Sequence, residues 1–122
     1  MHPKQKIISE LRLINKDYYL SRMILFNITH IISDQKAAAY TEWLKAEYIP
    51  LVKEQSTFRE IRLLKIVDSP NEGQSLSLQL LTNNQDDILK FKESLFNILQ
   101  KKMQEDFYGH LFLFDTVMEY ID

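Results

Sequence analysis

Apolar residues recur along this chain with two different spacings, and the order of those spacings predicts the fold. Residues 24–32 (ILFNITHII) are rich in β-branched and aromatic side chains, which is typical of a strand. Ser33 and Asp34 then offer helix caps. Residues 35–52 contain good helix formers, and their apolar side chains fall on one helical stripe that Pro50 disturbs near its end. Residues 58–67 are an apolar run interrupted by charges and predict a second strand.

The second half of the chain has the same strand–helix–strand order after a turn. The segment DSPNEG at residues 68–73 is the strongest turn signal in the chain. Residues 74–81 alternate between apolar and polar, so they predict a half-buried third strand that pairs with the second in a hairpin. An apolar helical stripe follows over residues 85–104, and residues 111–120 predict a fourth strand after Gly109.

This order, β-α-β-β-α-β, predicts an α+β domain of the ferredoxin-like type. Two split βαβ units with right-handed crossovers give a four-stranded antiparallel sheet with both helices on one face. We expect strands one and four to be central, and both carry large apolar side chains on both faces. A sheet with one face in water shows polar residues on that face. The second apolar face therefore predicts cover by another copy of the chain in a two-fold homodimer.

Residues 1–22 precede the domain as an N-terminal extension. Apolar side chains recur at helical spacing within residues 6–20, so one interpretation is an amphipathic helix. The alternative is that Met23 is the natural start, since the first strand begins directly after it. Both interpretations place the ferredoxin-like domain at residues 23–122.

Composition narrows the functional classes. The chain has 122 residues, of which 45% are hydrophobic and 26% charged, as in an ordinary single globular domain. Its net charge of −2 argues against a nucleic-acid-binding domain, which is usually basic. The absence of cysteine excludes disulfides and thiolate chemistry. No apolar run approaches the roughly 20 residues of a membrane span, and we expect a cytoplasmic protein with no membrane partner.

Short motifs after residue 22 carry a resemblance to a known family. They are the opening M-I-x-x-N-x-T at Met23, Ile24, Asn27 and Thr29, the helix with Trp43 and Ile49-Pro50, and Phe107-Tyr108-Gly109 before Phe112. They resemble DUF4286, a family of uncharacterised bacterial proteins. The resemblance implies a dimeric α+β barrel, in a superfamily with small monooxygenases and stress-responsive barrel proteins. Tyr48 stands where the family often has a histidine, and the family has no assigned activity, so the resemblance implies a fold and no particular chemistry.

Aromatic side chains on the first helix are the best candidates for a ligand site. We expect a small hydrophobic ligand, if one binds, to lie between this helix and the sheet against Trp43, Tyr40 and Tyr48. Asn27 and Thr29 in the first strand are the most plausible polar contacts. The alternative is that the rings fill the core. For Asn27 and Thr29 the alternatives are bonds to each other, to Asp115 or Glu119, or to a partner chain, or a position facing the interior of the dimer.

The histidines are weaker candidates for chemistry. His30 ends the first strand and His110 precedes the fourth, so antiparallel strands bring them to one end of the sheet, where imidazole could act as a base or metal ligand. Asp34 is the one carboxylate near them in sequence, and ordinary polar residues at a sheet edge are the favoured interpretation. HExxH, GxSxG, P-loop and GxGxxG motifs are absent. We therefore expect neither a metal nor a cofactor.

Two functions stay open from the sequence. The first is a homodimeric, non-enzymatic module that binds a partner or small ligand. The second is a cofactor-independent, monooxygenase-like enzyme that acts on a small aromatic or hydrophobic substrate, and it depends on fold analogy alone.

Overall fold

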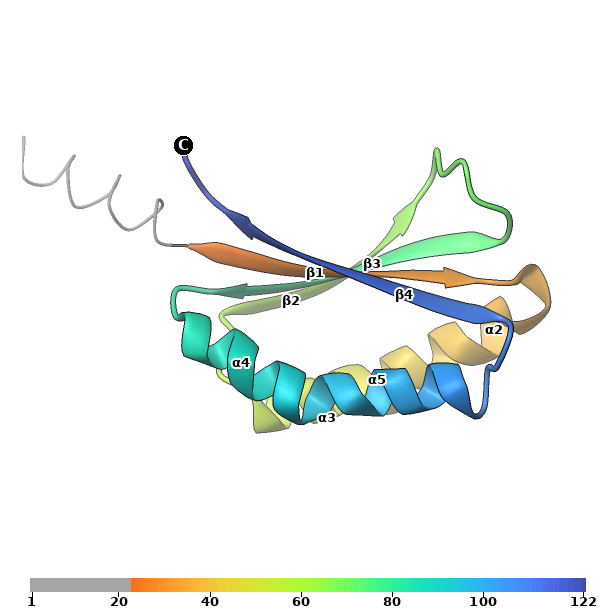
Figure 1. Ribbon diagram of the computed structural model, residues 1–122, viewed down its shortest axis with the longest axis horizontal. Coiled ribbons are helices and arrows are strands. Elements are labelled where there is room, and N and C mark those ends of the chain that lie inside the picture. The colour runs from red at the N-terminus through yellow and green to blue at the C-terminus, as the bar shows by residue number, and fades with distance from the viewer. Residues whose placement is uncertain (1–22) are drawn as a thin grey trace, which may run out of the picture.

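The computed structural model describes residues 23–122, which form one sheet covered on one face by helices (Figure 1). The predicted extension and its helix within residues 6–20 lie outside the described residues. The elements are β1 (Ile24–Ile32), α2 (Asp34–Trp43), η1 (Leu44–Tyr48), α3 (Ile49–Gln55), β2 (Glu60–Ile66), β3 (Gln74–Thr82), α4 (Gln85–Glu93), α5 (Leu95–Gln104) and β4 (Leu111–Glu119). The predicted β-α-β-β-α-β order and the four-stranded antiparallel sheet are confirmed.

The order of strands in the sheet corrects one expectation. The sheet runs β2-β3-β1-β4, so β1 is central as predicted, whereas β4 lies at an edge and β3 takes the other central place. The hairpin places β3 beside β2, and each βαβ crossover leaves room for one strand between its two parallel strands. β3 therefore fills the gap between β1 and β2, and β1 fills the gap between β3 and β4.

The first predicted helix is interrupted by a wider turn. α2 passes into η1, a π-helical segment, before α3 begins at Ile49. The backbone N–H of Ile49 donates to the carbonyl of Leu44, five residues earlier. Pro50 follows at once, and a proline has no N–H and crowds the carbonyl four residues before it. A widened turn at this point relieves that conflict, and π segments of this kind are rare in helices.

The second predicted helix is also two helices. Ser94 separates α4 from α5 with a non-helical backbone, φ −131° and ψ −79°. Its hydroxyl donates to the carbonyl of Lys90 at 2.7 Å, so the side chain competes with the backbone ladder at the break. The apolar stripe continues across the break, because Phe91 of α4 and Leu95 and Leu99 of α5 are all buried.

The core lies between the helices and the inner face of the sheet. In β1 burial alternates, and every second residue from Ile24 to Ile32 is buried toward the helices. Leu76, Leu78 and Leu80 share that face on β3, as the alternation of residues 74–81 predicts. Phe26 is fully buried and meets Phe91 edge-on with ring centroids 5.7 Å apart. All helices lie below the sheet in Figure 1, so its opposite face has no cover within residues 23–122.

The turn into β3 leads to a test of local packing. Gly73 has φ +81°, and a Cβ built on it would lie 2.4 Å from the carbonyl oxygen of Ile32. Gly109 has a similar φ of +76°, but a Cβ there would meet nothing within 4 Å. We expect Gly109→Ala to cost about 1–2 kcal/mol from backbone strain alone. Gly73→Ala should cost about 1–3 kcal/mol more, since backbone must move to relieve the clash. Urea unfolding of both variants checks this, and equal losses would contradict the contact.

Candidate functional site

The predicted aromatic residues of the first helix do lie together. Trp43 stacks on Tyr48 with ring centroids 5.3 Å apart and 29° between planes, and it lies 5.8 Å from the ring of Tyr40. Tyr40 and Tyr48 are buried, whereas Trp43 is partly exposed. The Lys102 ammonium lies 4.7 Å from the Trp43 ring centroid, within cation–π range. The two tyrosine rings occupy the space between helix and sheet, as the alternative interpretation expects of core residues.

His30 joins this cluster from the sheet. Its Nδ1 lies 2.5 Å from the Tyr40 hydroxyl, and its Nε2 is buried with no hydrogen-bond partner among residues 23–122. Burial lowers the pKa of His30 to about 3, so the imidazole is neutral near pH 7. Burial likewise raises the pKa of Tyr40 and of Tyr48, the latter with a smaller contribution from Tyr40. Tyr48 donates to the carbonyl of Leu95 at 2.8 Å. The cluster thus holds neutral polar groups in the core.

Asn27 and Thr29 do not lie with Trp43, which corrects the predicted single site. They occupy the other face of β1, which the helices leave uncovered. Ser77 donates to Asn27 Oδ1 at 2.5 Å, and Asn27 Nδ2 donates to Thr29 Oγ1 at 3.0 Å. Gln79 Nε2 donates to Ser77 Oγ at 3.2 Å and extends the network along β3. Such mutual bonding was one of the alternatives that the sequence left open.

This uncovered face is a polar strip between two apolar ridges. Large apolar side chains stand on the outer strands: Leu64, Ile66, Phe112, Phe114 and Met118. Smaller or polar side chains occupy the central strands: Ser75, Ser77, Gln79, Asn27 and Thr29. Ile31 closes one end of the strip and Leu25 with Leu81 the other, while Arg62 and Thr116 interrupt the ridges beside Gln79 and Asn27. Phe112 is 53% exposed and Phe114 59%.

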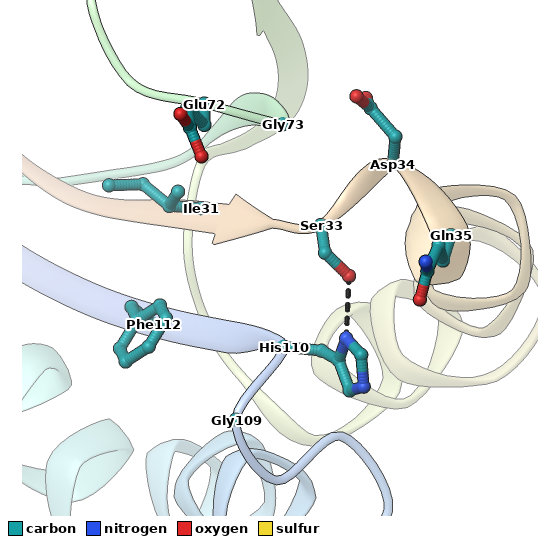
Figure 2. Close-up of a pocket in the computed structure, with 9 residues that line it drawn as sticks. All are labelled: Ile31, Ser33, Asp34, Gln35, Glu72, Gly73, Gly109, His110 and Phe112. Atoms are coloured by element: carbon teal, nitrogen blue, oxygen red, sulfur yellow. Dashed lines mark hydrogen bonds between the residues drawn. The ribbon is translucent and has the colours of Figure 1, made fainter.

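A cleft of about 420 Å³ opens where β1 ends and β4 begins. Its lining comes from the β1–α2 junction, the turn before β3 and the start of β4: Ile31, Ser33, Asp34, Gln35, Glu72, Gly73, Gly109, His110 and Phe112. Figure 2 shows Ser33 directed at His110, with Glu72 next to Ile31 and Asp34 just beyond the end of β1. Ser33 Oγ lies 2.7 Å from His110 Nδ1, and the Ser33 backbone N–H donates to the carbonyl of His110 at 2.9 Å.

The cleft was missed by sequence reasoning, although some of its residues were noted singly. Ser33 was expected to cap α2, but its side chain makes no capping hydrogen bond and reaches His110 instead. His110 and His30 do lie at the same end of the sheet, yet His30 bonds Tyr40 in the core. Glu72 carried no sequence signal beyond its place in a turn. Ser33 and His110 are 77 residues apart in the sequence, and no local sequence pattern could predict their contact.

Metal and membrane sites find no support in the part of the chain described. Among residues 23–122, no three histidine, aspartate or glutamate side chains are grouped so that they could hold a metal ion. None of the helices in that segment is long and apolar enough to cross a bilayer.

Comparison with known proteins supports the fold. A crystal structure of an ethyl tert-butyl ether D (EthD) family protein from Bacillus halodurans C-125 superposes with a TM-score of 0.56 at 16% identity. The match covers 79% of this chain and 97% of that protein. At this identity the likeness extends to the fold alone. No curated protein sequence matches the chain.

The family itself is shown by sequence. A family model described as a domain of unknown function, DUF4286, matches residues 23–121. The matched segment coincides with the folded domain and contains the motifs at Asn27, Trp43 and Gly109 that carry the resemblance. The chain belongs to the DUF4286 family.

Proposed function

We propose that this chain acts as a homodimeric, non-enzymatic binding module, in which two copies close their uncovered sheet faces against each other as a dimeric α+β barrel. The observation that carries the proposal is the exposure of Phe112, Phe114 and Met118 along one side of a sheet face that no helix of residues 23–122 covers. Contiguous apolar surface on a small domain commonly marks an interaction site. A two-fold dimer uses the same face twice and requires no other protein.

The polar residues of the face are compatible with being covered. Buried polar groups are costly when they lack partners. Ser77, Asn27 and Thr29 already bond one another, and Gln79 joins them. Covering this strip therefore leaves these bonds intact, while the ridges supply apolar surface on both sides.

The free energy of dimer formation indicates how much of the uncovered face must be buried. Burial of each half-exposed apolar side chain on the ridges contributes on the order of 1 kcal/mol. Five such side chains on each of two copies give roughly 10 kcal/mol, within the range of about 4–15 kcal/mol that association costs. The balance is close, so a stable dimer needs most of both ridges.

Sedimentation equilibrium at micromolar concentration tests this proposal. We expect a mass near twice the chain mass of 14.6 kDa, falling toward one chain mass on dilution. A single chain mass at every micromolar concentration would contradict the homodimer. Native mass spectrometry of the same sample reports any small ligand retained by the dimer.

A cofactor-independent, monooxygenase-like enzyme acting on a small aromatic or hydrophobic substrate is the second candidate. One observation favours it: the unused Nε2 of His30 lies in the core beside the aromatic cluster. The buried rings of Tyr40 and Tyr48 fill that space, which favours the first proposal. A flat hydrophobic substrate bound there would change Trp43 fluorescence, so a screen of such compounds that leaves the emission unaltered would count against the enzyme.

A further inference from the structure

The cleft at the end of the sheet has the size of a small-molecule site. Its volume of about 420 Å³ falls in the range of ligand pockets, about 300–1,000 Å³. Its walls are also held together. Ser33 and His110 are joined by a backbone and a side-chain hydrogen bond, and Gly73 packs directly against the end of β1 at Ile32. The cleft therefore exists without any rearrangement of the backbone.

The charged residues of the lining favour a ligand of positive charge. Asp34 and Glu72 are carboxylates, and the lining contains no lysine or arginine. Asp34 has a structural reason to be where it is, since an acidic residue in the first turn of α2 favours the helix dipole. Glu72 lies in the turn before β3 and has no such role. Neither carboxylate forms an ion pair within residues 23–122.

Part of the cleft lining is apolar. Ile31 and Phe112 are direct cross-strand partners on the uncovered face, and both line the cleft. The exposed ring of Phe112 could receive an apolar group or the face-on approach of a cation. The cleft thus combines two carboxylates with an apolar and aromatic part of its lining. Divalent metal ions are the less suitable cation, because no three ligating side chains are grouped anywhere in residues 23–122.

We propose that this cleft binds a small organic cation, an ammonium group on a compact apolar body. Glu72 and Asp34 would face the ammonium, the Ser33–His110 pair would offer hydrogen bonds, and Phe112 would contact the apolar body. The inference rests on the proposed binding module and names its ligand class. In the proposed dimer, the second copy would pack against the side of the Phe112 ring turned away from the cleft, and the side that lines the cleft would contact the ligand.

Titration with 2-phenylethylammonium, followed by amide NMR shifts, tests the proposal. We expect saturable shifts at Gly73, Gly109 and His110. The uncharged 2-phenylethanol should bind about fivefold more weakly, since it lacks the ion pair. Glu72→Gln should weaken the ammonium about fivefold and leave the alcohol unaffected. Added salt should weaken the ammonium only.

A matched variant and a second measurement keep the outcomes separate. Glu54→Gln removes a carboxylate that is also exposed, at the end of α3 and outside the cleft, and should leave binding unaltered. Equal affinity of the ammonium and the alcohol, shifts away from the cleft, or no effect of Glu72→Gln would overturn the proposal. The mass of each sample is measured in parallel. A monomer that binds the ammonium would contradict the dimer alone, and a dimer that does not bind it would contradict the ligand alone.

Discussion

The Phe114→Asp variant is expected to sediment as a monomer at concentrations where the unaltered chain is a dimer. Phe114 is 59% exposed near the middle of the β4 ridge, directly opposite Thr29 on β1. In a two-fold dimer, the substitution places two carboxylates in a largely apolar interface and removes two rings. Burial of an unpaired charge costs several kcal/mol. Because the favourable and unfavourable contributions to dimer formation nearly cancel, this loss should raise the dissociation constant of the dimer by about two orders of magnitude or more.

Leu89→Asp is the matched control. Leu89 is 56% exposed on α4, on the helical side of the molecule, and its replacement adds the same charge outside the proposed interface. That variant should keep the mass of the unaltered chain. Circular dichroism should show both variants folded, because neither side chain belongs to the core. A dimeric Phe114→Asp, or a Leu89→Asp that dissociates equally, would rule out the uncovered sheet face as the interface.

Stability is expected to fall steeply with acid because of His30. The pKa of this imidazole is lowered to about 3 by burial in the folded state, against about 6.5 in an unfolded chain. The unfolded state therefore binds one more proton between these two values. The contribution of His30 to the free energy of unfolding is fully present above about pH 6.5. It decreases by roughly 1.4 kcal/mol per pH unit as the pH falls toward 3. Urea unfolding from pH 7 to 4, at one fixed protein concentration, measures this slope.

His30→Gln isolates that contribution from the carboxylates, which also titrate in acid. The glutamine variant should be less stable at pH 7, because the contact with Tyr40 is disturbed, but its stability should depend less on pH. The two curves should converge as the pH falls. Parallel curves for the unaltered chain and His30→Gln would show that His30 does not sense the acid.

The buried contact between His30 and Tyr40 could not be predicted from the sequence. The alternation of residues 24–32 places it on the same face as Ile28 and Ile32, which is the helix-covered face. That pattern allows a core histidine, but the identity of its partner depends on α2 packing over the sheet. Tyr40 reaches it because the helix returns across β1, ten residues later.

Element type and order were determined by the sequence through local periodicity. Enrichment in β-branched and aromatic residues identified β1, and period-two alternation identified β3. Helical stripes identified the two helical regions, and the turn at residues 68–73 identified the hairpin. The boundaries agreed to within a few residues. The breaks at η1 and Ser94 were missed because an apolar stripe continues through a π turn or a single non-helical residue.

Strand order, side-chain partners and the cleft were decided by tertiary structure alone. β1 pairs with both β3 and β4, and which of these two is the second central strand depends on how the two crossovers interlock. The sequence predicted Trp43, Tyr40 and Tyr48 as one group, since they share a helix, but it could not separate Asn27 and Thr29 from them without knowing which face the helices cover. The cleft joins Ser33, Glu72 and His110 from three distant segments, and contacts of such long sequence separation arise only when the sheet assembles.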